Sequence, residues 1–334
     1  MSEKVNKTSS VSLSEILCAF EKQFGFKNKI KWASAVPIVL YHILAIYWCY
    51  HYSLPVKWQT VFFASIMYIL SGFGITGGAH RLWTHKAYKA KLPMKLFLLA
   101  CFASAGQNSL YQWVRDHRVH HKYSDTEADP HNANRGLFFS HIGWLMMKKN
   151  SEVILRGQQM DMSDIEADPV LRLYNKYFNY FKIMFCYVIP TAMTIWLWGE
   201  NWRCAVAWQC FIRFLSMFHS ELTVNSLAHA YGYRPYNKNI VPRENRFVAT
   251  CTFGEGWHNY HHAFPFDYKA AEHFDTFNLC TTFIHIFKKI GWAYDLREAT
   301  PEMINGIAKR LGDGTPVHFP MPIQAENKTT ERKK

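Results

Sequence analysis

Two long runs without a charged residue lie back to back near the start of the sequence, at residues 32–53 and 58–79. Each has about the 20 residues that an α-helix needs to cross a bilayer, and only the sequence LPVK separates them. A helix in a soluble core is the alternative for either run alone. Because two uncharged runs of spanning length follow each other directly, the sequence predicts a transmembrane helical hairpin.

A second pair of apolar runs lies within residues 180–230, and charged residues interrupt it. Lys182 and Arg203 are near the ends of these runs, where long side chains can reach the membrane interface. Arg213 and Glu221 lie inside the last run, and charges at that depth require a bundle interior or a polar cavity. We predict a second hairpin with these two side chains turned inward.

Basic residues gather on one side of the apolar runs. Four lysines precede the first run and five basic residues follow the second, whereas Lys57 alone lies between them. Basic flanks stay in the cytosol, so both termini should be cytosolic. The predicted fold is an all-α integral membrane protein with four transmembrane helices in two hairpins. Its segments are 1–31 (cytosolic), 32–79 (first hairpin), 80–178 (cytosolic), 179–228 (second hairpin), 229–314 (cytosolic) and 315–334 (polar tail).

The composition limits the classes of function. The net charge is +13 and the mean hydropathy is −0.17, so a basic, water-exposed part must accompany the spans. A basic surplus suits anionic lipid or a polyanionic substrate. No nucleic-acid-binding module is recognisable, so we predict no nucleic-acid partner. The 8 cysteines are scattered without a C-x-x-C motif, which indicates reduced cysteines rather than a disulfide framework.

One glycine-rich stretch, GFGITGGAHRLWTH, admits two interpretations. Gly72, Gly74 and Gly77 match the G-x-G-x-x-G fingerprint of dinucleotide-binding folds. That fingerprint requires a strand before it, a helix after it and an acidic residue about 20 positions on. Here the glycines end an apolar run, and no acidic residue follows until Asp116. We therefore predict that these small residues allow close helix packing.

Nine of the 17 histidines recur in a pattern that indicates a metal centre. Each of the two H-x-x-H-H boxes, at 117–121 and 258–262, places its imidazoles on one helix face, so that they present to one point. His80 and His85 are five residues apart, a spacing that does not fit one α-helical face, so we expect a helix end or a distortion there. The nine are His80, His85, His117, His120, His121, His229, His258, His261 and His262.

This many imidazoles exceeds the four ligands of one tetrahedral zinc, so two ions are predicted. Nitrogen donors suit iron, copper, nickel or zinc, and oxygen activation by two irons acting on a lipid fits a centre at a membrane face. A non-catalytic zinc-binding membrane protein is the alternative from another class. We predict that the other histidines are structural or solvated: His42, His51, His131, His141, His219, His273, His285 and His318.

The sequences HRLWTH, DHRVHHKYSDTEADPHN and GEGWHNYHHAFPFDYKAAE resemble the three histidine boxes of membrane fatty acyl-CoA desaturases of the stearoyl-CoA type, especially insect members. The resemblance extends from about residue 32 to about residue 314. It implies a cytosolic helical cap that holds a di-iron site (Fe2+/Fe3+) beside a narrow acyl tunnel. The nine histidines would be the iron ligands, and Asn225 would hold a water at one iron. Asp116, Asp129 and Glu255 would orient the imidazoles.

The resemblance also implies the reaction. The irons and O2 would remove hydrogen from two adjacent methylenes of a saturated long-chain acyl-CoA, leaving a cis double bond at the ninth or eleventh carbon. A lipid hydroxylase or acetylenase is the alternative within the same chemistry. The implied location is the endoplasmic reticulum membrane. The implied contacts to the CoA group are Asn108, Arg115, Asp116, Lys148 and Lys149, the last two being a solvated interfacial pair in the alternative interpretation.

Electrons must come from outside the chain, because it has no H-P-G-G haem motif and no nucleotide fold. The resemblance implies cytochrome b5 and its reductase as the donors. The sequence departs from the family in HSELTVNSLAH, where Leu222 stands at what is often a Trp position and Glu221 and Thr223 are polar. These positions lie near the tunnel in the family, so chain length and double-bond position are left open.

Overall fold

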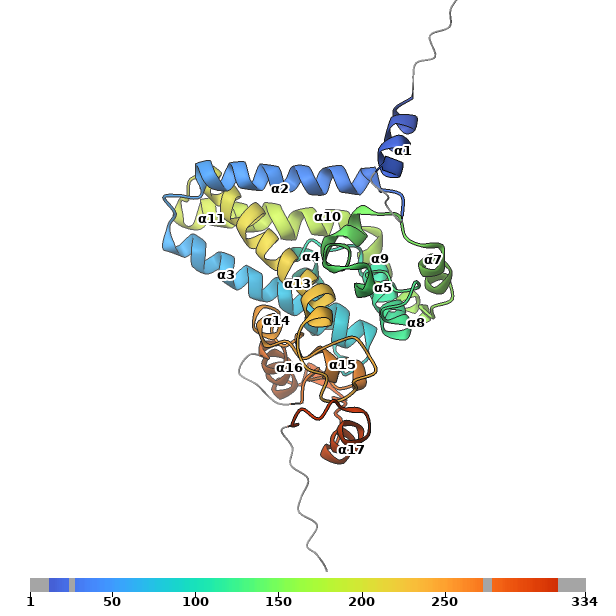
Figure 1. Cartoon of the computed structure of the whole chain (residues 1–334). Helices are drawn as coiled ribbons and strands as arrows, with labels where there is room; N and C mark the ends of the chain where they lie inside the picture. Colours follow the sequence, from blue (N-terminus) through green and yellow to red (C-terminus); the bar gives the residue numbers. More distant parts are fainter. Residues whose placement is uncertain (1–11, 24–27, 273–277, 318–334) are drawn as a thin grey trace, which may run out of the picture.

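Long apolar helices form one part of the molecule (Figure 1). The computed structural model describes residues 12–23, 28–272 and 278–317. Helices α2 (Trp32–Tyr52) and α3 (Trp58–Phe73) form the first hairpin, and α3 continues without a break into the π-helix η1 (Gly74–Thr84). In α2 only Ala35 and Ala45 are buried. A helix whose apolar side chains stay exposed in this way is typical of contact with lipid.

Within the described residues, three helical segments are long and apolar enough to cross a membrane: Trp32–Tyr52, Trp58–Thr84 and Phe178–Trp198. The third is built from α10 (Phe178–Lys182), η4 (Ile183–Val188) and α11 (Ile189–Trp198). The fourth predicted span corresponds to the continuous helix formed by α12 (Trp202–Val206), η5 (Ala207–Ile212) and α13 (Arg213–Ala230).

The fourth helix is not among the three apolar segments, because charged and polar residues lower its hydropathy. The four-span arrangement therefore stays a prediction. The inward orientation of Arg213 is confirmed: its guanidinium is buried and donates to the carbonyl oxygens of Ser104 and Gln209, 3.0 and 3.1 Å away. This polar anchor joins α13 to the helices beside it.

The remaining helices gather at one end of the long ones, where α5, α14, α15 and α16 lie close to the ends of α3 and α13 (Figure 1). A two-stranded antiparallel sheet pairs β1 (Lys89–Ala90) with β2 (Ala293–Tyr294), with Ala90 opposite Ala293. The other elements are α1 (Leu13–Gln23), α4 (Leu92–Ser104), α5 (Leu110–Tyr123), η2 (Ala133–Arg135), η3 (Phe139–Gly143), α6 (Trp144–Met146), α7 (Ser151–Gln158), α8 (Ser163–Ala167), α9 (Pro169–Lys176), α14 (Arg246–Cys251), α15 (His258–Ala263), α16 (Leu279–Lys289) and α17 (Pro301–Leu311).

In the glycine-rich stretch, Gly74 allows two helices to approach closely, as predicted. A Cβ added to Gly74 would lie 2.2 Å from the backbone nitrogen of Phe102 and 2.3 Å from the carbonyl carbon of Cys101, both in α4. Helix α4 is apolar and lies within the segment 80–178 that was predicted to be cytosolic. It packs on η1 and forms the core of this end of the molecule with Phe73 and Leu110, both buried.

The histidines predicted to be structural have varied surroundings. His42, His219 and His141 form a hydrogen-bonded series, with ring nitrogens 3.0 Å apart at each step. His285 accepts from or donates to the Tyr268 hydroxyl at 2.7 Å. His51 is exposed on α2. His273 and His318 lie outside the described residues.

Candidate metal centre

Five imidazoles from three separate segments meet in a first group. They are brought together from η1 and the residue after it, from α5 and from α15. His80 Nε2 and His261 Nε2 are 2.9 Å apart, and His121 Nε2 lies 3.0 Å from His261 Nε2. All five offer a ligand atom within 4.8 Å of the others: His80, His85, His117, His121 and His261.

The π-helix explains how His80 and His85 reach the same point. The backbone N–H of His85 donates to the carbonyl of His80 at 3.0 Å, five residues back, instead of four as in an α-helix. Residues five apart therefore share a face, and the two rings are 4.8 Å apart. The predicted distortion is confirmed.

A second group contains His120, His229, His258 and His262, again with ligand atoms within 4.8 Å of one another. His262 Nε2 lies 3.2 Å from both His258 Nε2 and His120 Nε2. The structure thus brings together all nine predicted histidines, in two groups of five and four.

The prediction that each H-x-x-H-H box presents to one point was wrong. In α5, His117 and His121 belong to the first group and His120 to the second. In α15 the assignment is reversed, with two imidazoles in the second group and His261 in the first. Residues i and i+4 lie nearly in line along a helix, whereas i+3 is displaced around it. Each box therefore serves two neighbouring points.

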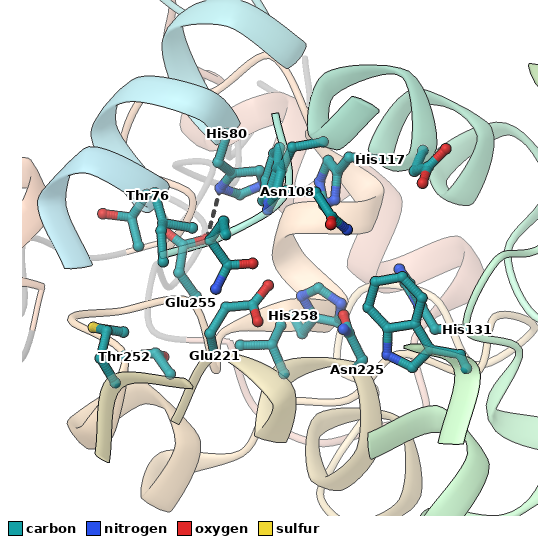
Figure 2. Close-up of a pocket in the computed structure, with 17 residues that line it drawn as sticks. Thr76, His80, Asn108, His117, His131, Glu221, Asn225, Thr252, Glu255 and His258 are labelled. Atoms are coloured by element: carbon teal, nitrogen blue, oxygen red, sulfur yellow. Dashed lines mark ion pairs between the residues drawn. The ribbon is translucent and has the colours of Figure 1, made fainter. Parts of the chain in front are cut away.

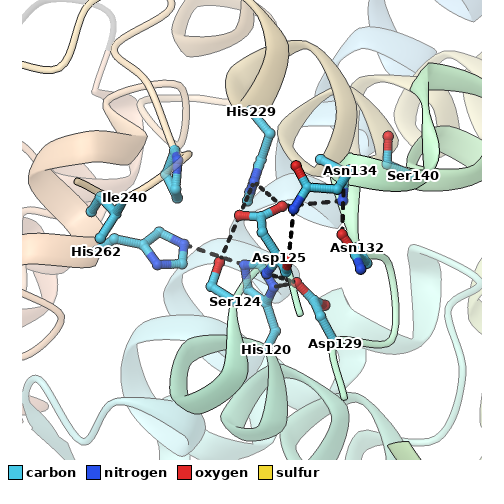
Figure 3. A network of polar contacts seen from close by, with 12 residues as sticks. His120, Ser124, Asp125, Asp129, Asn132, Asn134, Ser140, His229, Ile240 and His262 are labelled. Carbon is cyan, nitrogen blue, oxygen red and sulfur yellow. Dashed lines mark hydrogen bonds and ion pairs between the residues drawn. The ribbon is translucent and has the colours of Figure 1, made fainter. Parts of the chain in front are cut away.

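In three of the imidazoles, Nδ1 lies against a carboxylate. His80 Nδ1 lies 2.8 Å from Glu255, and His120 Nδ1 lies 2.9 Å from Asp129. These are two of the three acids predicted to orient imidazoles. In the second group, His229 Nδ1 lies 3.1 Å from Asp125 (Figure 3).

Asp125 is not among the acids that the sequence predicted to orient imidazoles, although it follows His121 by four residues, just after the end of α5. Asp116, by contrast, makes no hydrogen bond to an imidazole among the described residues. Its carboxylate pairs with Arg115 at 3.0 Å and with Lys149. Asp116 therefore positions two basic side chains instead. His131, predicted to be structural, lies with His120 and Asp129 in a third, smaller cluster.

The protonation of the cluster suits cation binding. Burial, reinforced by neighbouring imidazoles, lowers the pKa of most of these histidines well below its usual range, so they are neutral. Burial alone would also lower the pKa of His120, but Asp129 raises it. Although burial favours protonation of Glu255, His80 and Arg81 hold the pKa of its carboxyl at about 2. The histidines with a lowered pKa are His85, His117, His121, His258, His261 and His262.

The donor set fits two metal ions. A neutral imidazole carries one N–H, and in His80, His120 and His229 that proton belongs on Nδ1, facing a carboxylate. Their Nε2 lone pairs then point into the two groups, where other Nε2 atoms lie about 3 Å away. Convergent lone pairs repel each other unless they share a cation, and imidazole nitrogen is a ligand of iron, copper and zinc.

A narrow cavity of about 70 Å³ adjoins both groups (Figure 2). Its wall contains His80 and His258, one from each group, together with the apolar side chains of Ile75, Met217 and Val224. Asn225, predicted to hold a metal-bound water, also lines this cavity. An apolar chain in the cavity would therefore lie beside the imidazoles.

A second, larger cavity of about 880 Å³ adjoins the first. The two share Gln107, Asn108, Asp116 and Trp144 in their walls. The five residues predicted to contact CoA all line this larger cavity: Asn108, Arg115, Asp116, Lys148 and Lys149. The structure thus places a basic cavity next to an apolar one that ends at the histidines.

Comparisons with known proteins agree with this site. The family model described as fatty acid desaturase matches residues 56–275. The chain is 47% identical over 291 residues to an acyl-CoA Delta(11) desaturase of Spodoptera littoralis, with 86% of each chain covered. It is 45% identical to an acyl-CoA Delta-9 desaturase of Acheta domesticus (87% of this chain, 81% of the relative) and 44% identical to stearoyl-CoA desaturase 5 of Homo sapiens (87% and 88%). The resemblance noted from the histidine boxes is therefore confirmed, and the chain belongs to the fatty acid desaturase family of oxidoreductases.

Proposed function

We propose that the chain is an O2-dependent acyl-CoA desaturase that introduces a cis double bond into a saturated long-chain acyl-CoA, at the ninth or eleventh carbon. The observation that carries the proposal is the convergence of nine histidines at the inner end of an apolar cavity whose neighbour is lined by basic side chains. The relatives are named as Delta(11) and Delta-9 desaturases, so both positions stay within the proposal.

The two histidine groups would each hold one iron, with Asn225 contributing a water ligand to one of them. When bound, the irons would supply the oxygen chemistry that breaks unactivated C–H bonds, which no acid or base in the chain can do. The carboxylates of Asp125, Asp129 and Glu255 lie beside Nδ1 of their imidazoles, accept a hydrogen bond from its N–H and so keep Nε2 directed inward. Such outer partners hold both the tautomer and the ring orientation.

The basic cavity would bind the phosphates of CoA. Arg115 and Lys149 both pair with Asp116, and all three side chains line this cavity. Arginine and lysine are suited to phosphate oxygens. Beyond Asn108, the acyl chain would pass into the narrow cavity between Ile75 and Met217. Because methylenes form no hydrogen bonds, the fit of the acyl chain in this cavity would decide which carbons lie beside the metals.

We further propose that electrons come from cytochrome b5 and its reductase, and that the protein lies in the endoplasmic reticulum membrane with four spans, a cytosolic cap and both termini in the cytosol. The basic residues beside α2 and η1 support this orientation. The segment boundaries given in the sequence analysis belong to the same proposal.

Fatty-acid profiling after expression in a desaturase-deficient cell tests the proposal. We expect new monounsaturated acyl chains, with the double bond located by mass spectrometry of derivatised products. A hydroxylated or acetylenic product in place of the alkene would assign the site to the alternative chemistry. A purified protein that holds zinc when iron is in excess, and that desaturates nothing, would contradict the proposal altogether.

A further inference from the structure

The larger cavity extends beyond the five side chains that would contact CoA. One of its walls is a single face of α2, because the residues that line the cavity there recur at spacings of three and four. This face runs from the start of the helix to its middle, about 16 Å along the axis. Its members are Lys31, Ser34, Pro37, Ile38, Tyr41 and His42.

Aromatic rings from η4 and α13 complete the wall at the inner end of the cavity. The rings of Tyr187 and Phe214 have centroids 5.6 Å apart, and those of Tyr41 and Phe214 are 5.3 Å apart. Because Tyr41 and Phe214 belong to different walls, the cavity ends where they meet. We call this inner part the α2 arm; it is lined by Pro37, Ile38, Tyr41, His42, Tyr187, Phe214, Leu215 and Phe218.

The polar atoms in the wall of the α2 arm already have partners within the protein. His42 Nδ1 lies 2.7 Å from the carbonyl oxygen of Ile38, and His42 Nε2 lies 3.0 Å from His219 Nε2. The hydroxyls of Tyr41 and Tyr187 are hydrogen-bonded as well. Polar groups that are paired in this way need no hydrogen bond from a ligand. The α2 arm therefore offers a surface that suits an alkyl chain.

The α2 arm and the narrow cavity diverge at the segment before α5. Gly106 lines the larger cavity with a φ of +69°, and a Cβ there would lie 2.5 Å from the Phe214 ring. The next two residues, Gln107 and Asn108, line both cavities. The narrow cavity leads from this fork to the histidines, whereas among the described residues no histidine of either group lines the α2 arm. An alkyl chain in the α2 arm is therefore out of reach of the metal positions.

Two lysines lie where the α2 arm joins the basic part of the cavity. Lys31 immediately precedes α2, and Lys182 ends α10, near the start of the third apolar segment. Basic side chains at the end of a span reach the headgroup level, where they attract anionic groups. The cavity is thus basic at one end and apolar at the other, which matches an amphiphile with a polyanionic head and one alkyl chain.

The α2 arm is accessible from the lipid side. Helix α2 lies at the edge of the helical bundle (Figure 1), and Pro37 is exposed although it lines the cavity. A long alkyl chain favours the bilayer over water. A route that leads from the bilayer through the α2 arm to the narrow cavity keeps such a chain in apolar surroundings.

We propose that the α2 arm is a second binding position for the alkyl chain of acyl-CoA, through which the chain passes between the bilayer and the narrow cavity. This inference rests on the proposed desaturase function. The CoA group stays in the basic part of the cavity while the chain moves past Gln107 from one arm of the fork to the other. The chain is unreactive in the α2 arm, and the product leaves by the same route. A membrane phospholipid is the competing occupant.

Photo-crosslinking tests where the chain binds. The probe is palmitoyl-CoA with a diazirine in the middle of the chain, added to purified, iron-loaded protein in phosphatidylcholine vesicles without an electron donor, so that no turnover occurs. We expect labels near Met217 and Val224 in the narrow cavity and near Ile38 and Leu215 in the α2 arm. Unlabelled palmitoyl-CoA should displace both sets.

Two results of this experiment would overturn the inference. In one, the probe labels the narrow cavity alone. In the other, a photoreactive phosphatidylcholine labels the α2 arm and palmitoyl-CoA does not displace it, which would identify the occupant as a membrane lipid.

A substitution that fills the α2 arm tests the route. Ile38→Trp places a larger side chain in the arm, and Ile43→Trp is the matched control, because Ile43 lies on the same helix, is 55% exposed and lines neither cavity. The rate at which bound radiolabelled palmitoyl-CoA exchanges with vesicles should fall about tenfold or more in Ile38→Trp, as overpacking by one large side chain predicts. Ile43→Trp should exchange like the wild type. The double-bond position of the product should be the same in both variants, since the narrow cavity decides it.

An Ile38→Trp protein that exchanges palmitoyl-CoA at the wild-type rate would contradict the route. If Ile38→Trp does not fold, which a lost unfolding transition reveals, Leu215→Trp takes its place with the same expected outcome. The inference and the proposed function fail differently. Labels in the narrow cavity alone, together with desaturation of palmitoyl-CoA, refute the α2 arm and leave the function standing. A probe that labels neither arm refutes acyl-CoA as the ligand and with it the proposed function.

Discussion

At the scale of single residues, the histidines divide into two groups that can be tested separately. His120→Ala removes a member of the second group and His261→Ala a member of the first. We expect each to abolish desaturation and to lower the iron content, because the remaining nitrogens cannot complete the coordination. Elemental analysis and product profiling measure both effects.

The control for these variants is His51→Ala, since His51 is exposed on α2 and far in sequence from every box. It should leave iron content and activity unchanged. All three variants should insert into the membrane like the wild type. Retained turnover in His120→Ala or His261→Ala would refute the ligand role of that residue.

Asp125 is predicted to position His229 without touching substrate. Asp125→Asn weakens the acceptor that faces His229 Nδ1 at 3.1 Å. We expect a loss of iron affinity of about 10–100-fold, as is usual for partners of metal-binding imidazoles. Iron affinity is measured by competition with a chelator. Asp295→Asn is the control, because Asp295 pairs with Lys89 on the surface; equal affinities in the two variants would show that Asp125 has no such role.

The buried imidazoles also predict how the stability of the metal-free protein depends on pH. His121, His262 and the other histidines with a lowered pKa stay neutral when folded but take up protons in the unfolded chain below about pH 6.5. The unfolded state then binds more protons, so the free energy of unfolding should fall as the pH falls. His120, with its raised pKa, contributes in the opposite direction. Thermal unfolding of chelator-treated protein between pH 8 and pH 5 measures this; a midpoint that does not decrease would contradict it.

At the scale of elements, the contact between η1 and α4 depends on Gly74. Gly74→Ala would place a methyl group 2.2 Å from a backbone atom of Phe102, which neither helix can avoid by rotating a side chain. We expect a loss of stability of about 1–3 kcal/mol or more, as in an overpacked core, and a displaced first histidine group. The melting temperature and the iron content measure the two effects.

Gly306→Ala in α17 is the control, because an added Cβ there meets no atom within 4 Å. It should be neutral or slightly stabilising, since alanine favours a helix. If Gly74→Ala is equally harmless, the close approach of the two helices is not what positions η1.

The sequence predicted which residues form the site, but it did not predict how the helices distribute them between the two groups. The boxes in α5 and α15 were identifiable because histidine is rarely repeated in this way. The π-helix was predicted only as a distortion, since nothing local in GITGGAHRLWT selects a five-residue turn. The division of each box between two groups depends on how α5 and α15 face each other, which no pattern within one helix records. Asp125 was missed for the same reason, because its partner His229 is distant in sequence.

At the scale of the whole molecule, the number of spans decides where the C-terminus lies. With four spans, a glycosylation tag in the turns around residues 54–57 or 199–201 should be modified, and tags at either terminus should not. With three spans, a C-terminal tag would lie in the lumen and be modified. The sequons at Asn6 and Asn327, which lie outside the described residues, are expected to remain unmodified. A shift in electrophoretic mobility that glycosidase treatment reverses measures each case.

The family and the first transmembrane hairpin could both be predicted from the sequence, because each depends on residues that are contiguous in the chain. The second hairpin could not be fixed in the same way. Arg213 and Glu221 make its last helix too polar for hydropathy alone to classify, and their partners become apparent only in three dimensions. A charged residue inside a span lowers its hydropathy and makes the span harder to recognise. Because such a charge is costly in a membrane, it also indicates a functional position.

The division of the boxes has a consequence for assembly. Because α5 and α15 each supply imidazoles to both histidine groups, neither of the two proposed metal positions can be complete until both helices are docked. Filling one position would therefore prepare the other. A preparation given too little iron should consist of molecules that are either empty or doubly filled, with few that carry a single ion.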